Sequence, residues 1–279
     1  MQSPSRYYPA FDKPPLCLAV AGADAMPGPL LVSLMTRLDL TASANRSILN
    51  RMVGHGMLGL ERAGRVGVYR LAGRLLADFQ RIQQGGPPPA WDGRLQTLIY
   101  DVPEGQRTDR ERFRAAAMRA GYRPLRPGVL VGVGDRSAAL AEAIDRLGVL
   151  RGCLDVDADT ARLVAERAWG LAALREDGEQ LAASLRRLLA DLSPLEGEAA
   201  FLQLHRMMRP VVAWTVALGD LPPELLPPDW PGARLGELLG EAHFRLLPAA
   251  SGFVHGVINA SPHAALVEWS HGEQHRAAG

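Results

Sequence analysis

The feature that most constrains the fold is a run of two glycines and three prolines, Gly85, Gly86, Pro87, Pro88 and Pro89. Such a run cannot continue a helix, and its prolines cannot donate hydrogen bonds to a sheet, so it indicates a linker between domains. A chain of 279 residues has room for two or three domains at roughly 100 to 200 residues each. We expect a first domain over 1–84, a linker over 85–93, a second domain over 94–158 and a third over 159–279.

Charge is distributed unevenly along the chain. The formal net charge is only +1, but the first 90 residues carry ten Lys and Arg against five Asp and Glu. The remaining residues carry 21 against 25, and Lys13 is the only lysine of the chain. Hydrophobic residues make up 47% and charged residues 22%, which is ordinary for a globular protein and argues against disorder. The first domain is therefore a basic module on an otherwise slightly acidic chain.

The cysteines predict a reducing compartment. Cys17 and Cys153 lie far apart and form no C-x-x-C pair, so neither a disulfide framework nor a thiolate metal site is expected, and a cytoplasmic location fits best. The apolar stretch from Pro15 to Gly22 resembles the core of a signal peptide, but it is short and Asp24 ends it. No stretch approaches the roughly 20 apolar residues of a membrane span, so we expect no membrane partner.

Two helices and a hairpin are predicted in the first domain. Apolar residues recur at three- and four-residue spacing over 27–38 and over 44–53, and 58–71 has two short Leu- and Val-rich segments around Ala63 and Gly64. This order, helix, turn, helix and hairpin, is that of a winged helix-turn-helix, which places one helix in the major groove and the hairpin against phosphates or the minor groove.

The candidate DNA-contacting residues follow from helical geometry. The apolar stripe Ile48, Leu49, Met52 and Val53 faces the core, and Asn45 falls on the same inner side. The candidates are the outward residues of the second helix and the basic and aromatic residues of the hairpin, which suit contacts with guanine, adenine and phosphate. They are Ser43, Arg46 (at the edge), Ser47, Asn50, Arg51, Arg62, Arg65, Tyr69 and Arg70. The alternatives are a merely solvated helix face and a winged helix that binds protein.

The remaining chain predicts an α+β fold with several domains. Strands are expected over 94–102, 122–125, 129–133 and 149–156, with helices over 108–121 and 137–147. This β-α-β-β-α-β order is that of a ferredoxin-like domain. From Thr160 onward the pattern is helical, with helices expected over 161–174, 179–192 and 197–209, so the third domain is predicted to be mostly helical.

Several segments together resemble one family. Three segments look like the DNA-binding region of the PaaX family of bacterial transcriptional repressors. They are Asn45 to Met52, Gly56 to Leu58 and the hairpin Glu61 to Leu71. Tyr100 to Glu104 and Gly121 to Val129 resemble its central ferredoxin-like domain, which is itself similar to small CRISPR-associated nucleases. The most specific signal is in the last third, and it consists of Leu225, Leu226, Pro227, Asp229, Trp230, Pro231 and Gly232. With Asn45 where the family usually has an apolar residue, the chain resembles a divergent member.

The resemblance implies a function. It implies a homodimeric repressor of an aromatic-compound catabolic operon, such as one for phenylacetate, that binds a palindromic double-stranded DNA operator and is released by an aryl acyl-CoA. His205, Arg206 and Arg209 form a basic edge suited to the phosphates of coenzyme A, and Trp230 could line an aromatic pocket. The alternative is that the first three are solvated or salt-bridged structural residues and that Trp230 is a buried anchor.

An enzymatic role is not expected. Asp101, at the end of the first central strand, occupies a place where the CRISPR-associated nucleases hold a metal-binding aspartate, but one carboxylate per chain is a poor metal site unless a partner supplies another. Neither a G-x-S-x-G nor an H-E-x-x-H motif occurs. We therefore expect no catalytic residues, no bound metal and no cofactor, and a ligand-responsive regulator is favoured over a protein-interaction adaptor or a metal-dependent nuclease.

Overall fold

The computed structural model describes residues 11–38, 41–84 and 90–270, so most of the expected linker, residues 85–89, lies outside the described residues. Over these described residues the fold is α+β with two four-stranded antiparallel sheets. The chain forms two compact units, each built from separated segments. Unit 1 comprises Met1–Gly86, Leu181–Ala213 and Arg234–Gly279, and unit 2 comprises Pro87–Gln180 and Trp214–Ala233. The predicted boundaries at 94, 158 and 159 stay a prediction.

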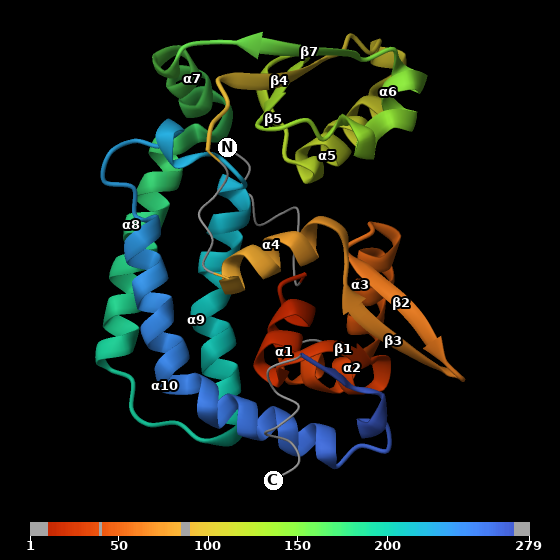
Figure 1. Cartoon of the computed structure of the whole chain (residues 1–279), viewed down its shortest axis with the longest axis vertical. Coiled ribbons are helices and arrows are strands. Elements are labelled where there is room, and N and C mark those ends of the chain that lie inside the picture. The colour runs from red at the N-terminus through yellow and green to blue at the C-terminus, as the bar shows by residue number, and fades with distance from the viewer. Residues whose placement is uncertain (1–10, 39–40, 85–89, 271–279) are drawn as a thin grey trace. The chain divides into compact units, whose positions relative to one another are not determined.

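The first segment of unit 1 contains four helices and three strands among its described residues (Figure 1). These elements are α1 (Lys13–Ala21), β1 (Ala23–Pro27), α2 (Gly28–Arg37), α3 (Ala42–Gly54), β2 (Leu58–Ala63), β3 (Val66–Leu71) and α4 (Gly73–Gln84). The two predicted helices and the hairpin are present, and the prediction from sequence missed α1, β1 and α4. The apolar stretch that resembles a signal peptide is the buried helix α1, in which Leu16, Cys17 and Leu18 belong to the core.

Polar groups tie α1, α2 and α3 together. Lys13 is only 3% exposed, and its ammonium group donates a hydrogen bond to the carbonyl of Leu38, just past the end of α2. The helix dipole favours a cation at this position. Asn45 of α3 is fully buried and donates to Thr36 Oγ1 of α2 at 3.2 Å. The inner position predicted for Asn45 is therefore confirmed, and its amide gives α2 and α3 a specific polar contact inside an apolar interface.

The sheet of unit 1 contains a strand from the far end of the chain. Its order is β2-β3-β1-β8, where β8 is the two-residue strand Glu268–Trp269. β3 pairs with β1 in the register Ala25↔Arg70, and β8 pairs with the other edge of β1 in the register Ala23↔Trp269. Beyond β8, the amide of Ser270 donates to the carbonyl of Gly22 at 2.9 Å. The sheet that carries the hairpin is thus completed by residues near the end of the chain.

Three long helices account for most of the last third. They are α8 (Leu171–Ala190), α9 (Gly197–Leu218) and α10 (Gly232–Asn259), and each contributes residues to both units. Within unit 1, Phe201 of α9 and Phe253 of α10 pack with ring centroids 5.9 Å apart, and Arg245 of α10 donates to the carbonyls of Leu189 and Leu192 at the end of α8. The predicted helix end near Arg209 is wrong, because α9 continues through Pro210 to Leu218.

Unit 2 contains the predicted β-α-β-β-α-β order. Its elements are β4 (Arg94–Ile99), α5 (Arg107–Ala120), β5 (Arg123–Arg126), β6 (Val129–Gly132), α6 (Ala141–Leu147) and β7 (Leu150–Asp155), followed by α7 (Ala158–Ala165). The strands are ordered β5-β6-β4-β7 and all pairs are antiparallel, as in a ferredoxin-like sheet. α5 and α6 cover one side of this sheet (Figure 1), with Leu98, Phe113, Leu130 and Ile144 in the core between them.

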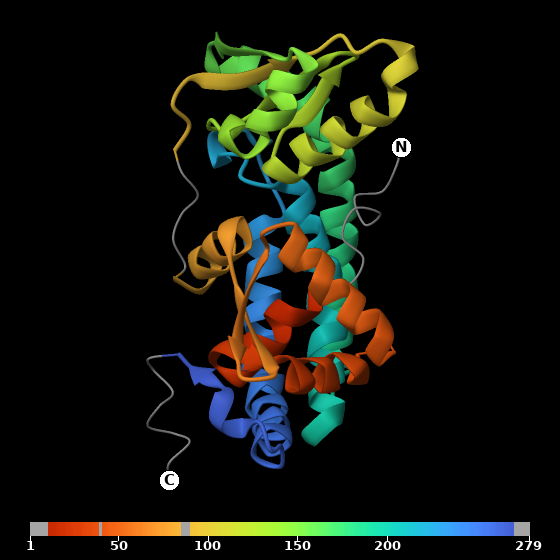
Figure 2. The ribbon, with the colours of Figure 1, turned by 90° about the vertical axis from the view of Figure 1, so that its right-hand side faces the viewer.

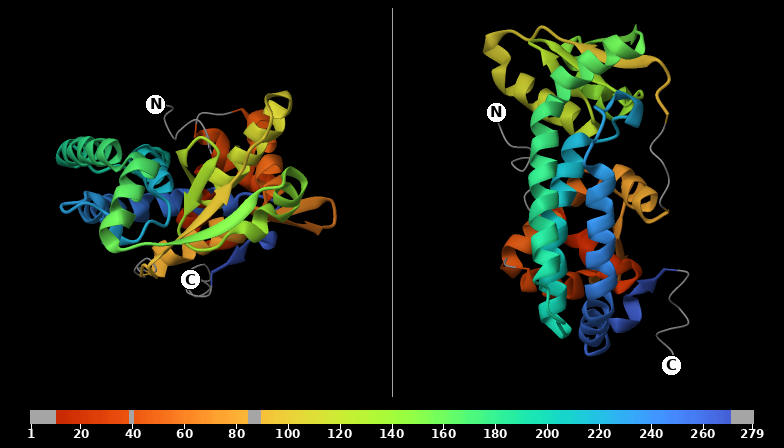
Figure 3. Two further views of the ribbon diagram at one scale, coloured as in Figure 1. Left: turned by 90° about the horizontal axis from the view of Figure 1, so that it is seen from above. Right: turned by 90° about the vertical axis from the view of Figure 1, so that its left-hand side faces the viewer.

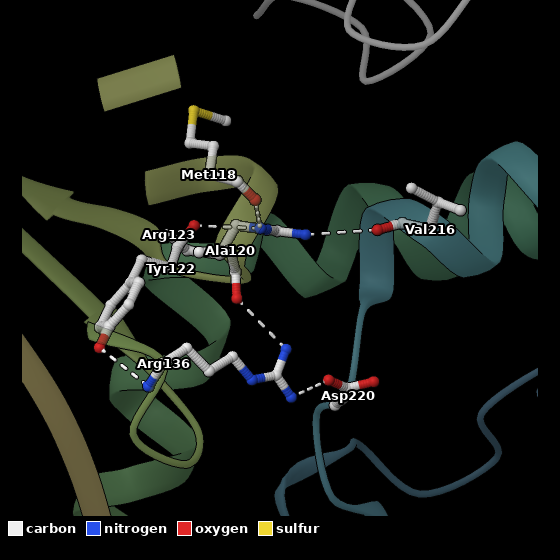
Figure 4. A network of polar contacts seen from close by, with 7 residues as sticks. All are labelled: Met118, Ala120, Tyr122, Arg123, Arg136, Val216 and Asp220. Atoms are coloured by element: carbon white, nitrogen blue, oxygen red, sulfur yellow. Dashed lines mark hydrogen bonds and ion pairs between the residues drawn. The ribbon is translucent and has the colours of Figure 1, made fainter. Parts of the chain in front are cut away.

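Two arginines attach the last residues of α9 and the turn after it to this sheet domain (Figure 4). Arg123 donates to the carbonyl of Met118 at the end of α5 at 3.1 Å and to that of Ala217 at the end of α9, also at 3.1 Å. Arg136 donates to the carbonyl of Ala120 at 3.3 Å and forms an ion pair with Asp220. Each guanidinium therefore joins the end of α5 to the end of α9 or the turn after it, where the helix dipoles favour positive charge.

Candidate nucleic-acid interface

The candidate interface is built on α3, whose ends are set by its own sequence. Thr41 caps the helix, because its Oγ1 accepts a hydrogen bond from the amide of Ala44 at 3.2 Å. Ile48, Leu49 and Met52 form the buried stripe, with exposures of 3% or less. The helix contains two arginines and no acidic residue. Its outer face is therefore basic without an internal carboxylate to neutralise it.

All five residues predicted to face outward on α3 are exposed. They are Ser43, Arg46, Ser47, Asn50 and Arg51. The geometric prediction of the outward face is confirmed, whereas DNA contact by these residues remains a prediction. Two guanidinium groups, one amide and two hydroxyls give this face donors and acceptors of the kind that bind base edges and phosphates.

Arg51 has an aromatic support that the sequence analysis missed. Its guanidinium lies over the ring of Phe11, 5.6 Å from the centroid, and the same ring is 6.4 Å from that of His55. An arginine held over a ring in this way keeps its positive charge, but its side chain can adopt fewer conformations. Phe11 thus positions the arginine on the exposed face. No local signal links residues 40 positions apart in sequence, so only the fold reveals the pair.

The hairpin β2–β3 presents two further arginines at its tip. The strands pair without interruption from Leu58↔Leu71 to Ala63↔Val66, and Gly64 follows with φ of 61°. A type II′ hairpin turn requires a positive φ at its first central residue, which glycine adopts without strain. Arg62 and Arg65 flank this glycine and are both exposed. The hairpin extends beside α3 with its turn at the free end (Figure 1, Figure 2).

The other two hairpin residues predicted to contact DNA have partners within the unit. Tyr69 is half-buried against the start of α2, since a Cβ on Gly28 would lie 2.9 Å from its ring. Arg70 donates to Glu61 at 2.7 Å and to Glu268 of β8 at 3.0 Å. Two carboxylates therefore already balance the charge of Arg70, which distinguishes it from the two arginines at the tip.

The predicted ligand-binding residues are split between the units. His205, on α9 in unit 1, is 7% exposed, and its Nε2 lies 2.8 Å from Asp12 Oδ2. Burial by itself raises the pKa of Asp12, but the hydrogen bond and charge of His205 and the charge of Arg209 outweigh it, so the pKa lies below the ordinary 3.8. Arg206 and Arg209 are exposed. The histidine is thus held in a structural pair, and the two arginines remain at the surface of α9.

Trp230 belongs to unit 2 and packs against a second tryptophan. The rings of Trp230 and Trp214 stack with centroids 5.4 Å apart, and Trp214 Nε1 donates to the carbonyl of Leu174 at 2.7 Å. A Cβ on Gly178 would lie 2.6 Å from Pro231 and 3.0 Å from Trp214, so these groups are in tight contact. The environment of Trp230 within unit 2 is that of a packing anchor.

Asp101 is exposed and lies two residues beyond β4, which ends at Ile99 and not at Val102 as predicted. Among the described residues no group of three or more His, Cys, Asp or Glu side chains could hold a metal ion. No helix within 11–38, 41–84 or 90–270 is long and apolar enough to span a membrane.

The fold defines an α+β protein with a central β-α-β-β-α-β domain, and comparison with known families is more specific. Residues 88–164 match the family model described as the PaaX protein central Cas2-like domain. Residues 169–256 match that of the PaaX-like protein C-terminal domain. Together the matches span more than half of the chain, which therefore belongs to the PaaX family, whose members are regulators rather than enzymes. The resemblance inferred from sequence is confirmed.

Comparisons with individual proteins add little. A search of curated proteins finds no match. One solved structure similar to this chain is the uncharacterized protein Rv0674 from Mycobacterium tuberculosis, at 23% identity and a TM-score of 0.42, with 82% of this chain and 90% of that chain covered.

Proposed function

We propose that the chain is a transcriptional repressor that binds duplex DNA through α3 and the β2–β3 hairpin. In this proposal α2, α3 and the hairpin, together with β1, form a winged helix-turn-helix. α3 occupies the major groove, and the hairpin tip contacts phosphates beside it. The protein acts as a homodimer on an inverted repeat, because two copies related by a twofold axis match a palindromic operator.

One observation carries this proposal. Four arginines, Arg46 and Arg51 on α3 and Arg62 and Arg65 at the hairpin tip, are exposed on adjoining elements of the same unit. A DNA duplex carries one phosphate charge per roughly 1.7 Å of its axis, and such a cluster suits it. Membership in a family of regulators supports the same function.

The effector part of the proposal concerns α9. The PaaX resemblance implies an aryl acyl-CoA inducer from aromatic catabolism, and Arg206 and Arg209 are the exposed cations suited to its phosphates. An inducer of this kind must bind the DNA-free protein more tightly than the DNA-bound protein, because only a difference in affinity shifts the equilibrium. We do not assign a ligand contact to His205, because its Nε2 is already hydrogen-bonded to Asp12.

Binding to the DNA upstream of the protein's own gene tests the function. Fluorescence anisotropy with a labelled duplex is expected to give tight, sequence-specific binding that weakens steeply with salt. Replacing Arg46 and Arg51 with Ala is expected to cost roughly 1–3 kcal/mol for each lost base contact. Weak binding without sequence preference would instead favour a protein-interaction adaptor. Cleavage of the duplex with Mg²⁺ that is lost in Asp101→Ala would favour a nuclease.

The effector is tested on the preformed complex. Phenylacetyl-CoA is expected to release the DNA, whereas free coenzyme A, which lacks the aryl thioester, is expected to release less. Replacing Arg206 and Arg209 with Ala is expected to raise the thioester concentration needed for release. Retention of the DNA at saturating phenylacetyl-CoA would contradict this effector while leaving the repressor intact.

A further inference from the structure

Two consecutive residues at the start of α1, Phe11 and Asp12, contact two different helices of unit 1. The ring of Phe11 lies 5.6 Å from the guanidinium carbon of Arg51 on α3. The carboxylate of Asp12 lies 2.8 Å from Nε2 of His205 on α9. The N-terminal helices, in red, lie against the unit 1 part of the long helices (Figure 3, right). A single peptide unit therefore joins the exposed face of α3 to a buried side chain of α9.

The carboxylate of Asp12 is directed away from its own helix. An aspartate at a helix start ordinarily accepts a hydrogen bond from an amide of the first turn, but Asp12 precedes α1 without such a bond. Although burial raises the pKa of Asp12, the hydrogen bond with His205 helps to keep it below 3.8, so the carboxylate is ionised at neutral pH. An ionised carboxylate only accepts, and therefore Nε2 of His205 carries the donated proton.

The pair between Asp12 and His205 is shielded from water. The side chain of Asp12 is 13% exposed and that of His205 is 9% exposed. Removing either group leaves the other buried without this hydrogen bond, and a buried group in that state is costly. The backbone of Asp12 is also fixed, because its carbonyl accepts from the amide of Leu16 at 3.2 Å. The position of the residue before it, Phe11, is therefore tied to α9.

Phe11 contacts the last turn of α3 at two points. Its ring is 8% exposed and lies under Arg51 and 6.4 Å from the ring of His55. His55 follows α3 directly, and its amide donates to the carbonyl of Arg51 at 3.0 Å. Arg46, on the same exposed face, has no such ring contact among the described residues. The two arginines of α3 therefore differ in how firmly the rest of unit 1 holds them.

Holding Arg51 in place has a measurable value for binding. Immobilising a side chain as flexible as arginine upon association costs the equivalent of roughly two- to tenfold in affinity. A guanidinium that already lies over a ring has given up part of that freedom before it meets DNA. The ring leaves the charge and the donors free for guanine or phosphate, which an ion pair with a carboxylate does not.

We propose that Phe11 and Asp12 are positioning residues for Arg51, and that His205 of α9 controls them. Breaking the pair between Asp12 and His205 releases Phe11, and Arg51 then samples more orientations. Arg46, which depends on none of these contacts, keeps its own. The inference rests on the proposed function, because it assigns to a buried histidine a part of the sequence preference that Arg51 supplies.

Sequence preference at two base pairs tests this coupling. Binding of the full chain to a pool of randomised duplexes, followed by sequencing, gives the preference at each operator position. Arg51→Ala identifies the base pair that this arginine contacts, and Arg46→Ala identifies a second one. His205→Leu and Phe11→Leu are each expected to weaken the preference at the Arg51 base pair roughly two- to tenfold, and to leave that at the Arg46 base pair unchanged. An equal loss at both base pairs, or no loss at either, would overturn the coupling.

Conservative variants and double variants sharpen this test. His205→Gln keeps an amide donor for Asp12, and Phe11→Tyr keeps a ring, so both are expected to retain the wild-type preference. In the Arg51→Ala background, His205→Leu is expected to cause no further loss of affinity, whereas in the Arg46→Ala background it causes the full loss. Equal losses in the two backgrounds would indicate a merely structural role for His205. Urea unfolding checks that each variant is folded under the conditions of the assay.

A measurement without DNA separates this inference from the proposed function. In nuclear magnetic resonance spectra of the free protein, the ring of Phe11 shifts the Nε–H resonance of Arg51, and Arg51→Ala assigns it. His205→Leu is expected to move this resonance toward its position in Phe11→Leu, and His205→Gln is expected to leave it in place. An unmoved resonance in His205→Leu would overturn the coupling even in a chain that binds its operator. A resonance that moves in a chain that binds no DNA would leave the coupling standing and remove only the proposed function.

Discussion

The two arginines at the hairpin tip and the third arginine of the same hairpin are expected to behave differently toward DNA. Arg62 and Arg65 are exposed on either side of Gly64. Arg70, on β3, is held between Glu61 at 2.7 Å and Glu268 at 3.0 Å. A cation already balanced by two carboxylates displaces few counterions from a phosphate. We therefore compare the double variant Arg62→Ala with Arg65→Ala against Arg70→Ala.

The size of the effect follows from counterion release. Each phosphate contact on duplex DNA contributes about 0.9 to the slope of log affinity against log salt. Two arginines per protomer make four in a dimer, so the double variant is expected to flatten the slope by about 3.6. Over a fourfold rise in salt, wild-type affinity should then fall roughly a hundredfold further than that of the variant. Arg70→Ala is expected to change the slope by less than about 1.

Fluorescence anisotropy of a labelled operator duplex, titrated at several KCl concentrations, measures both slopes. The variants replace surface side chains, so their unfolding free energies should stay within about 0.5 kcal/mol of wild type, apart from the lost ion pairs of Arg70. An unchanged slope in the double variant would refute the assignment of the hairpin tip to phosphates. A loss in Arg70→Ala as large as in the double variant would refute the distinction drawn from its carboxylate partners.

Three further predictions concern stability, each measured by urea unfolding. Asn45→Ala is expected to cost about 1–2 kcal/mol, because it removes the buried bond between α2 and α3, and no loss would contradict that role. Gly178→Ala is expected to cost about 1–3 kcal/mol through overpacking, whereas the control Gly240→Ala, where a Cβ meets nothing within 4 Å, should stabilise by about 0.5–1 kcal/mol. Asp12 has a lowered pKa when folded, so its contribution is present above pH 3.8 and lost as pH falls through the lower folded value. Asp12→Asn should therefore be less stable than wild type at neutral pH and show a weaker acid dependence, and identical acid profiles would refute this.

The sequence predicts elements whose pattern is local. The outward face of α3 follows from helical periodicity, and each of its five predicted residues is exposed. The strand and helix order of unit 2 follows from short alternating segments bounded by glycine and proline, and it is confirmed. In both cases the information lies within about 15 consecutive residues, over which side-chain pattern and backbone geometry are directly linked.

The features missed from sequence depend on distant partners. α1 is apolar on nearly every side, so it shows no periodicity, and Pro14 and Pro15 lie at its start, where proline is tolerated, rather than interrupting it. β8 is too short to have a pattern of its own. The partner of His205 is 193 residues away, and Arg70 and Glu268 are 198 residues apart. Such pairs are visible only once the chain has folded.

The pairing of β8 with β1 has a consequence for biosynthesis. The hairpin emerges from the ribosome early, but the strand that completes its sheet is made almost two hundred residues later. The sheet that carries the hairpin therefore reaches its four-stranded form only after Glu268 and Trp269 have been synthesised. A nascent chain that has been made only as far as the hairpin contains three of the four strands, β1, β2 and β3, and one edge of β1 is still without its partner strand β8.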